Sequence, residues 1–69
     1  MEKIKTLIAD DVEGLRLLLK AHIKQFNCTV IKEIEDGSKV IEAIQQTNPD
    51  LVLLDINMPG KNGLDILNL

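Results

Sequence analysis

Residues 51–55, Leu-Val-Leu-Leu-Asp, constrain the fold more than any other stretch of the chain. Four aliphatic residues in a row are typical of a strand that is buried on both faces, as strands in parallel sheets are. The run stops at Asp55, and Asn57, Pro59 and Gly60 follow in a turn-forming segment. A strand that ends in this way puts its carboxylate at the edge of the sheet where parallel α/β folds carry functional residues.

Strands and helices alternate along the chain. Ile4–Ala9 and Cys28–Ile34 are short and rich in β-branched residues, which predicts two strands before the third at Leu51–Leu54. Between the first two strands, apolar residues recur at spacings of three and four, which places them on one face of a helix that ends at Asn27. These residues are Val12, Leu15, Leu18, Leu19, Ile23 and Phe26.

A second helix is predicted before the third strand. Asp36 or Ser38 caps it, and Pro49 ends it because proline does not continue a helix. Its apolar side consists of Val40, Ile41, Ala43 and Ile44. Strands joined by single helices pair in parallel through right-handed crossovers, so the chain is predicted to be α/β with a parallel sheet. A third helix is expected to start near Leu64.

Three carboxylates follow two of the predicted strands. Asp10 and Asp11 come directly after the first strand, and Asp55 ends the third. If these strands are neighbours, the three side chains meet at one edge of the sheet, where their charges repel one another. Mg²⁺ prefers such oxygen ligands, and an aspartate can also act as a nucleophile toward phosphorus. A simple nucleotide or flavin phosphate site is disfavoured, because two anions occupy the loop that would bind the phosphate.

Each of these features also has a structural interpretation. Asp10 and Asp11 can cap the following helix, as acidic residues before helices often do. His22 is expected to be a partly exposed structural histidine, and Cys28 a small buried hydrophobic residue. A basic helix face is most often simply solvated, and here it consists of Arg16, Lys20 and Lys24.

Composition excludes several classes of function. A chain of 69 residues forms one small domain. The net charge of −3 and the single aromatic residue, Phe26, argue against a nucleic-acid partner. No window of the sequence reaches the roughly 20 apolar residues of a membrane span. The lone Cys28 fits a reducing compartment, so we expect a cytoplasmic protein.

Three segments together resemble the receiver domain of two-component response regulators, the CheY-like family. They are IADD at residues 8–11, EDGSKVIEAIQQTNPD at residues 35–50 and LVLLDINMPGKNG at residues 51–63. The resemblance implies a flavodoxin-like sheet with strand order 2-1-3, so that the first and third strands are neighbours.

The resemblance also implies roles for particular residues. Asp55 would accept a phosphoryl group from a histidine kinase or a phosphotransfer protein. Mg²⁺ would be bound by Asp55 itself, by Asp11 directly, by Asp10 through water and by the backbone carbonyl of Asn57. The basic helix face with Arg16 would be a candidate docking surface for the phosphotransfer partner.

Set against the family pattern, residues 1–69 are expected to form one truncated receiver domain. The fourth and fifth strands and helices of the family have no counterpart, nor do its hydroxyl residue after the fourth strand and its lysine after the fifth. The third strand then becomes an open apolar edge, which invites pairing with another chain. We therefore expect a homodimer that buries Leu51, Val52, Leu53 and Leu54, either by antiparallel pairing or by exchange of elements.

Three functional hypotheses follow. The first is a phosphoacceptor module that is not an enzyme. The second is a self-associating structural or engineered fragment without signalling activity. The third is an aspartyl-phosphate hydrolase of the haloacid-dehalogenase type, which is disfavoured because those enzymes carry a second aspartate at the position of Asn57.

Overall fold

The computed structural model describes residues 2–55, which form three strands and two α-helices. In chain order the elements are β1 (Ile4–Ala9), α1 (Glu13–Ile23), β2 (Cys28–Ile34), α2 (Val40–Thr47) and β3 (Leu51–Leu54), with short 3-10 turns at Lys24–Phe26 and Gly37–Lys39. The three predicted strand ranges are confirmed. The third helix expected near Leu64 lies outside the described residues.

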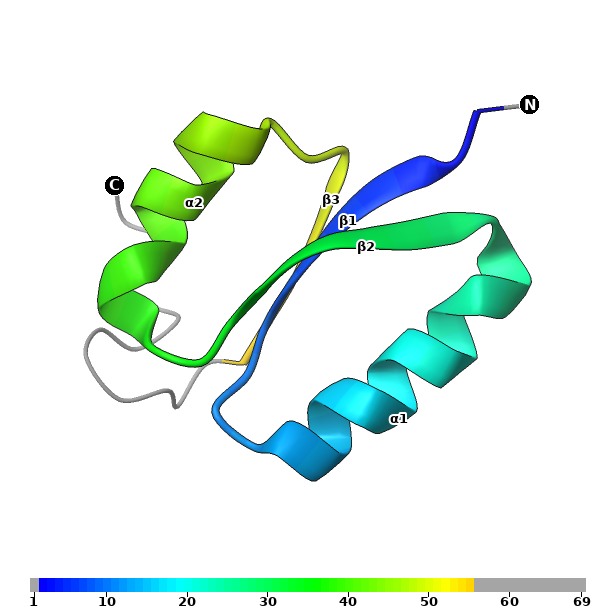
Figure 1. Ribbon diagram of the computed structural model, residues 1–69, viewed down its shortest axis with the longest axis horizontal. Coiled ribbons are helices and arrows are strands. Elements are labelled where there is room, and N and C mark those ends of the chain that lie inside the picture. Colours follow the sequence, from blue (N-terminus) through cyan, green and yellow to red (C-terminus); the bar gives the residue numbers. More distant parts are fainter. Residues whose placement is uncertain (1, 56–69) are drawn as a thin grey trace.

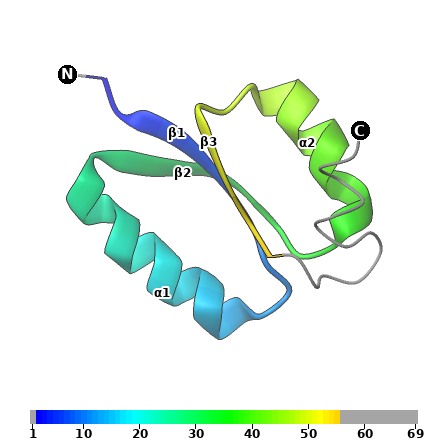
Figure 2. The same cartoon turned by 180° about the vertical axis from the view of Figure 1, so that it is seen from behind.

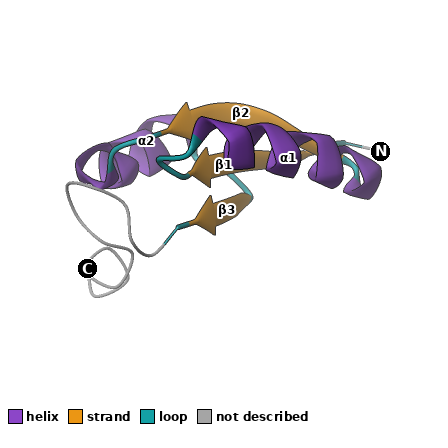
Figure 3. Ribbon diagram, turned by 90° about the horizontal axis from the view of Figure 1, so that it is seen from below, coloured by secondary structure: helices purple, strands orange, loops and turns teal. Residues whose placement is uncertain are grey.

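The three strands form one parallel sheet in the order β2-β1-β3, which confirms the predicted arrangement (Figure 3). The central strand β1 pairs with β2 up to Ala9 opposite Ile34, and with β3 up to Ala9 opposite Leu54. All three strands therefore end at the same edge of the sheet. That edge carries the residues that the sequence analysis singled out.

The two helices cover opposite faces of the sheet (Figures 1 and 2). Alternate residues of β1 point to the two faces, as the pleat of a strand requires. On the α2 face, the buried cluster consists of Leu7, Ala9, Ile34, Val40 and Ala43, with Val52 and Leu54 packed against it. On the α1 face it consists of Ile8, Ile23 and Cys28, with Leu19, Val30 and Leu53 packed against it.

The apolar stripe of α1 reaches the core only in part. Leu19 and Ile23 pack on the sheet, as the spacing predicts. Most of the stripe is exposed, with Leu18 at 67% and Phe26 at 60%. The stripe is wider than the surface that the three described strands offer it. Periodicity identified the apolar face of the helix but did not show how much of it is covered.

Polar residues end the helices as local chemistry requires. Asn27 and Asn48 take up left-handed backbone conformations with φ of 60° and 49°, which asparagine tolerates better than most residues. Asp36 caps the turn before α2, since its carboxylate accepts a hydrogen bond from the Ser38 amide at 2.9 Å. Asp36 therefore caps this turn and Ser38 does not, while the N-cap of α2 itself is Lys39, which makes no side-chain cap bond.

Neither described helix is long and apolar enough to cross a membrane. The open edge at β3 is present, since β3 pairs with β1 alone among the described strands. Completion of the sheet by a second copy stays a prediction.

Candidate metal and phosphoacceptor site

Backbone hydrogen bonds across the sheet set the positions of the acidic residues. The Asp55 amide donates to the carbonyl of Ala9 at 2.8 Å, and the Asp10 amide donates to the carbonyl of Ile34 at 2.9 Å. Each bond continues the pairing of strands by one residue beyond the strand end. Asp55 is thereby fixed beside the residue that precedes Asp10.

The three predicted carboxylates do converge. One oxygen each of Asp10, Asp11 and Asp55 can be chosen so that all lie within 4.8 Å of one another. An octahedral Mg²⁺ at about 2.1 Å from each ligand holds its oxygens roughly 3 to 4 Å apart. The donor set is all oxygen and all anionic, which is the chemistry that a hard divalent cation selects. The chemistry of these residues therefore fits the cation, and their oxygens lie near the spacing that it requires.

The three carboxylates differ in their surroundings. Asp10 is 8% exposed, and its Oδ1 accepts a hydrogen bond from the Val12 amide at 2.9 Å. Asp11 is exposed, and Asp55 is half-buried. Neither Asp10 nor Asp11 is the N-cap of α1, although Asp10 does bond a backbone amide just before the helix. The N-cap of α1 is Val12, which has no side-chain cap, and Asp10 instead closes the turn just before it.

Arg16 is a residue of this region whose role the sequence analysis missed. The prediction treated the basic face of α1 as solvated, yet the Arg16 side chain is only 13% exposed. Its Nη1 donates to the carbonyl of Asp10 at 2.7 Å, and its Nε donates to Glu33 at 3.3 Å. Lys20 donates to the other oxygen of Glu33 at 3.0 Å. The i, i+4 spacing of Arg16 and Lys20 was visible in the sequence, but their shared partner on β2 was not.

Comparison with known proteins then decides the family. The model of the response regulator receiver domain matches residues 6–69. The chain belongs to this family. The resemblance expected from the acidic pair and the strand-ending aspartate is confirmed, and the chain is a partial receiver domain of two-component signalling.

Individual relatives show how much of a receiver domain is present. The chain is 43% identical over 68 residues to a protein-glutamate methylesterase/protein-glutamine glutaminase of Pyrococcus horikoshii, covering 97% of this chain and 18% of the relative. It is 36% identical over 64 residues to the chemotaxis protein CheY of Listeria monocytogenes, covering 93% of this chain and 54% of that one. The chain therefore spans about half or less of the curated relatives it matches.

A solved structure gives the same picture of the fold. The signal receiver domain of a putative LuxO repressor protein from Vibrio parahaemolyticus superposes with a TM-score of 0.84 at 27% sequence identity. The match covers 96% of this chain and 50% of that one. The described residues thus adopt the first half of a receiver fold with its acidic edge formed. Asn57, the predicted fourth metal ligand, lies outside the described residues.

Proposed function

We propose that this chain is a Mg²⁺-dependent phosphoacceptor module and that Asp55 takes the phosphoryl group. The observation that carries the proposal is the convergence of Asp10, Asp11 and Asp55 within 4.8 Å at the carboxyl edge of a parallel sheet. Family membership supports a histidine kinase, or a phosphotransfer protein that it charges, as the donor. In this role the chain accepts a group and is not itself an enzyme with turnover.

The reaction assigned to Asp55 is a transfer between two nucleophiles. A carboxylate oxygen of Asp55 forms a bond to phosphorus while the bond from phosphorus to the donor's imidazole nitrogen breaks, and the imidazole keeps that electron pair and takes up a proton. Asp55 suits this role because it is half-buried at the sheet edge and its backbone is held to β1. The product is an aspartyl-phosphate.

The other two aspartates are proposed to bind the cation. When bound, Mg²⁺ supplies positive charge that offsets the charge on the transferring phosphoryl oxygens. Asp11 is exposed and faces solvent, so it can offer an oxygen to the cation directly. Asp10 already uses Oδ1 for the Val12 amide, which fits a more distant role through water. The backbone carbonyl of Asn57 is retained as a proposed fourth ligand.

Phosphoryl acceptance is tested with a small phosphoramidate donor and Mg²⁺, read out by intact mass. We expect one added phosphoryl group per chain, removed by base as acyl phosphates are. Asp55→Asn should lose the added mass completely, because an amide oxygen is a poor nucleophile. Asp50→Asn is the matched control, since Asp50 lies at the opposite edge of the sheet. Modification of Asp55→Asn to the wild-type extent would refute the assignment.

A second proposal concerns self-association through the outer edge of β3. Among the described strands β3 has a partner on one side only, and Leu51 is 38% exposed. An apolar strand edge of this kind pairs readily with another copy, and two-fold symmetry would join the two edges antiparallel. Such a dimer would also cover Leu51–Leu54, whose side chains are incompletely buried.

The dimer is tested by light scattering over a range of protein concentrations. We expect mass to rise toward twice the monomer value, and Leu51→Lys to restore the monomer because a charge at the edge opposes pairing. Leu17→Lys is the control, since Leu17 is 55% exposed on α1 and away from the edge. A monomer at all concentrations, with normal circular dichroism, would rule the dimer out.

A further inference from the structure

We infer that Arg16 is a positioning residue for the acidic edge and that it acts through the backbone carbonyl of Asp10. The inference deepens the proposed function, because it rests on a cation site at Asp10, Asp11 and Asp55. Arg16 touches neither a carboxylate of that cluster nor, in this account, the cation. Its role is to fix the peptide that carries Asp11.

Asp10 is held by hydrogen bonds at its amide, its carbonyl and its side chain. Its amide is bonded to Ile34 at 2.9 Å, its carbonyl to Arg16 at 2.7 Å and its side chain to Val12 at 2.9 Å. Backbone and side chain are thus held from three directions. Residues that hold a metal-site ligand by hydrogen bonds in this way set its orientation.

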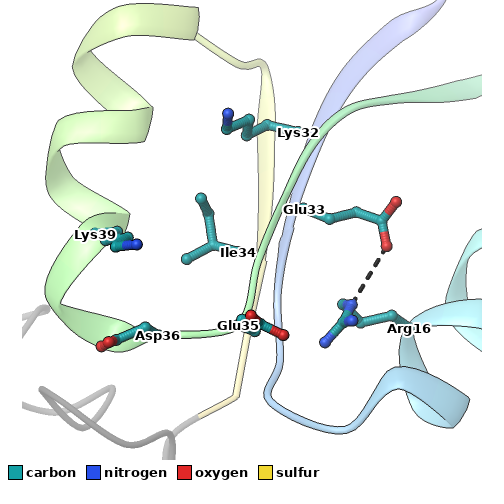
Figure 4. Close-up of a pocket in the computed structure, with 7 residues that line it drawn as sticks. All are labelled: Arg16, Lys32, Glu33, Ile34, Glu35, Asp36 and Lys39. Carbon is teal, nitrogen blue, oxygen red and sulfur yellow. Dashed lines mark hydrogen bonds and ion pairs between the residues drawn. The ribbon is translucent and has the colours of Figure 1, made fainter.

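The Arg16 side chain is itself held in place by a second partner, Glu33. Glu33 accepts from its Nε at 3.3 Å, and Glu33 directly precedes Ile34, the partner of the Asp10 amide. The contacts therefore form a closed ring. Asp10 is bonded to Ile34, the neighbouring Glu33 is bonded to Arg16, and Arg16 is bonded back to Asp10. Figure 4 shows Arg16 reaching from α1 to Glu33 on β2. Arginine suits this position because its planar head donates in two fixed directions at once.

The Asp11 side chain depends on the peptide that Arg16 holds. Its carboxylate is exposed, and within residues 2–55 no hydrogen bond holds it. The position of the backbone therefore limits which points this carboxylate can reach, and no partner in residues 2–55 selects among its rotamers. The peptide joining Asp10 to Asp11 is the one whose carbonyl Arg16 holds. Releasing that carbonyl frees the peptide to rotate and moves Asp11 away from Asp55.

A simple charge effect would act in the opposite direction. A guanidinium beside a cation site repels the cation, so removing Arg16 would tighten Mg²⁺ binding if charge were all that mattered. The Arg16 guanidinium is already paired with Glu33, and the Arg16 side chain is only 13% exposed. The positioning account predicts weaker binding instead. The direction in which Mg²⁺ affinity changes when Arg16 is removed therefore separates charge repulsion from positioning.

The experiment compares wild type, Arg16→Ala, Arg16→Lys and Lys20→Ala in the 69-residue chain. Lysine keeps the charge of Arg16 but has no fork to join two partners. Lys20→Ala removes the other cation from Glu33 and leaves the Asp10 carbonyl bonded. Mg²⁺ affinity is measured by NMR titration, amide exchange of Val12 is measured without metal, and circular dichroism reports folding.

We expect both Arg16 variants to bind Mg²⁺ about tenfold more weakly, as is common when a residue that orients a ligand is lost. Both should also exchange the Val12 amide faster in the metal-free protein, because the turn closed by Asp10 loosens. Lys20→Ala should stay within about twofold of wild type in affinity, since exposed ion pairs contribute little.

Tighter or unchanged Mg²⁺ binding by Arg16→Ala would overturn the inference, and so would equal losses in Arg16→Lys and Lys20→Ala. If wild type itself bound no Mg²⁺, the proposed function would fail separately. The Val12 exchange rates in the metal-free proteins would then decide the positioning role alone. Faster exchange in Arg16→Lys but not in Lys20→Ala supports it, and equal rates refute it.

Discussion

The two edges of the sheet each carry aspartate beside β1 and β3, but one edge has a single carboxylate and the other has a cluster of three. At the edge where the strands begin, the Asp50 carboxylate accepts from the Lys5 amide at 2.9 Å, and the Asp50 amide donates to the Lys5 carbonyl at 2.8 Å. One carboxylate there joins two strands. At the edge where the strands end, Asp10, Asp11 and Asp55 crowd within 4.8 Å.

A lone carboxylate that holds two strands together has a structural role, whereas a cluster of like charges points to a bound cation. Asp50 lies opposite a backbone donor, so its charge is used by the fold and its removal costs stability. Asp10 at the other edge also accepts from a backbone amide, that of Val12, but it lies in a cluster of three carboxylates whose charges repel one another. Such a cluster is understandable if a cation offsets the charge. Three expected effects test this contrast, and a fourth, the smallest, concerns a carboxylate outside both edges.

The largest effect is expected from adding Mg²⁺. At a concentration one hundred times its dissociation constant, the cation should raise the free energy of unfolding of wild type by about 2.7 kcal/mol. The free energy of unfolding of Asp50→Ala should rise by the same amount, although it is lower than that of wild type without the cation. The free energy of unfolding of Asp11→Asn should hardly rise. Urea unfolding at fixed ionic strength, with and without the cation, measures this. An equal gain in Asp11→Asn would show that Mg²⁺ binds elsewhere.

Removing the structural carboxylate should give the next effect. Asp50→Ala leaves the Lys5 amide without its partner, and we expect a loss of about 1 kcal/mol in the free energy of unfolding. Urea unfolding in chelator gives the value, with Asp50→Asn as the control because its amide oxygen still accepts. Full stability in the alanine variant would mean that this edge is held without Asp50.

Neutralising one of the crowded carboxylates should stabilise the metal-free protein. Two unit charges about 4 Å apart repel by about 1 kcal/mol in water, so Asp11→Asn should gain up to that amount in chelator. The gain should shrink as salt is added, because salt screens exposed charges. A less stable Asp11→Asn at low salt would show that this carboxylate contributes to the fold, as Asp50 does.

The smallest effect is expected at Asp36, which lies in the turn before α2 and at neither of the two edges compared above. Hydrogen bonds from the Ser38 amide and hydroxyl hold the pKa of Asp36 below its ordinary value of 3.8, with Lys39 assisting. A lowered folded-state pKa gives stability that is present above the ordinary value and is lost as pH falls through the folded value. The difference in stability between wild type and Asp36→Asn should therefore change only below about pH 4. A change centred near neutral pH would point to another group.

The acidic edge could be predicted from sequence in two parts, since chain order gives the shared edge and the family resemblance implies that β1 and β3 are neighbours. Alternation of strands with single helices puts the ends of all strands at one edge, and the adjacency of β1 and β3 then brings Asp10, Asp11 and Asp55 together. The role of Arg16 could not be predicted in the same way. Its partners are the carbonyl of Asp10 and the side chain of Glu33, and the register of β2 decides that they lie within its reach.

The apolar face of α1 shows a second limit. A spacing of three and four tells which residues share a face of a helix but not what lies against that face. Leu19 and Ile23 meet the sheet, while Leu15 and Leu18 are 47% and 67% exposed. Burial depends on the surface that other elements provide, and the described half of the receiver fold provides only part of it.

The most direct test of the central claim is a calorimetric titration of the metal-free chain with Mg²⁺ at constant ionic strength. The account predicts one saturable site per chain, with affinity unchanged in Asp50→Ala and at least about 100-fold weaker in Asp11→Asn, since a direct ligand matters more than an orienting one. Absence of saturable heat, or equal weakening in both variants, would contradict the claim that the acidic edge is a cation site.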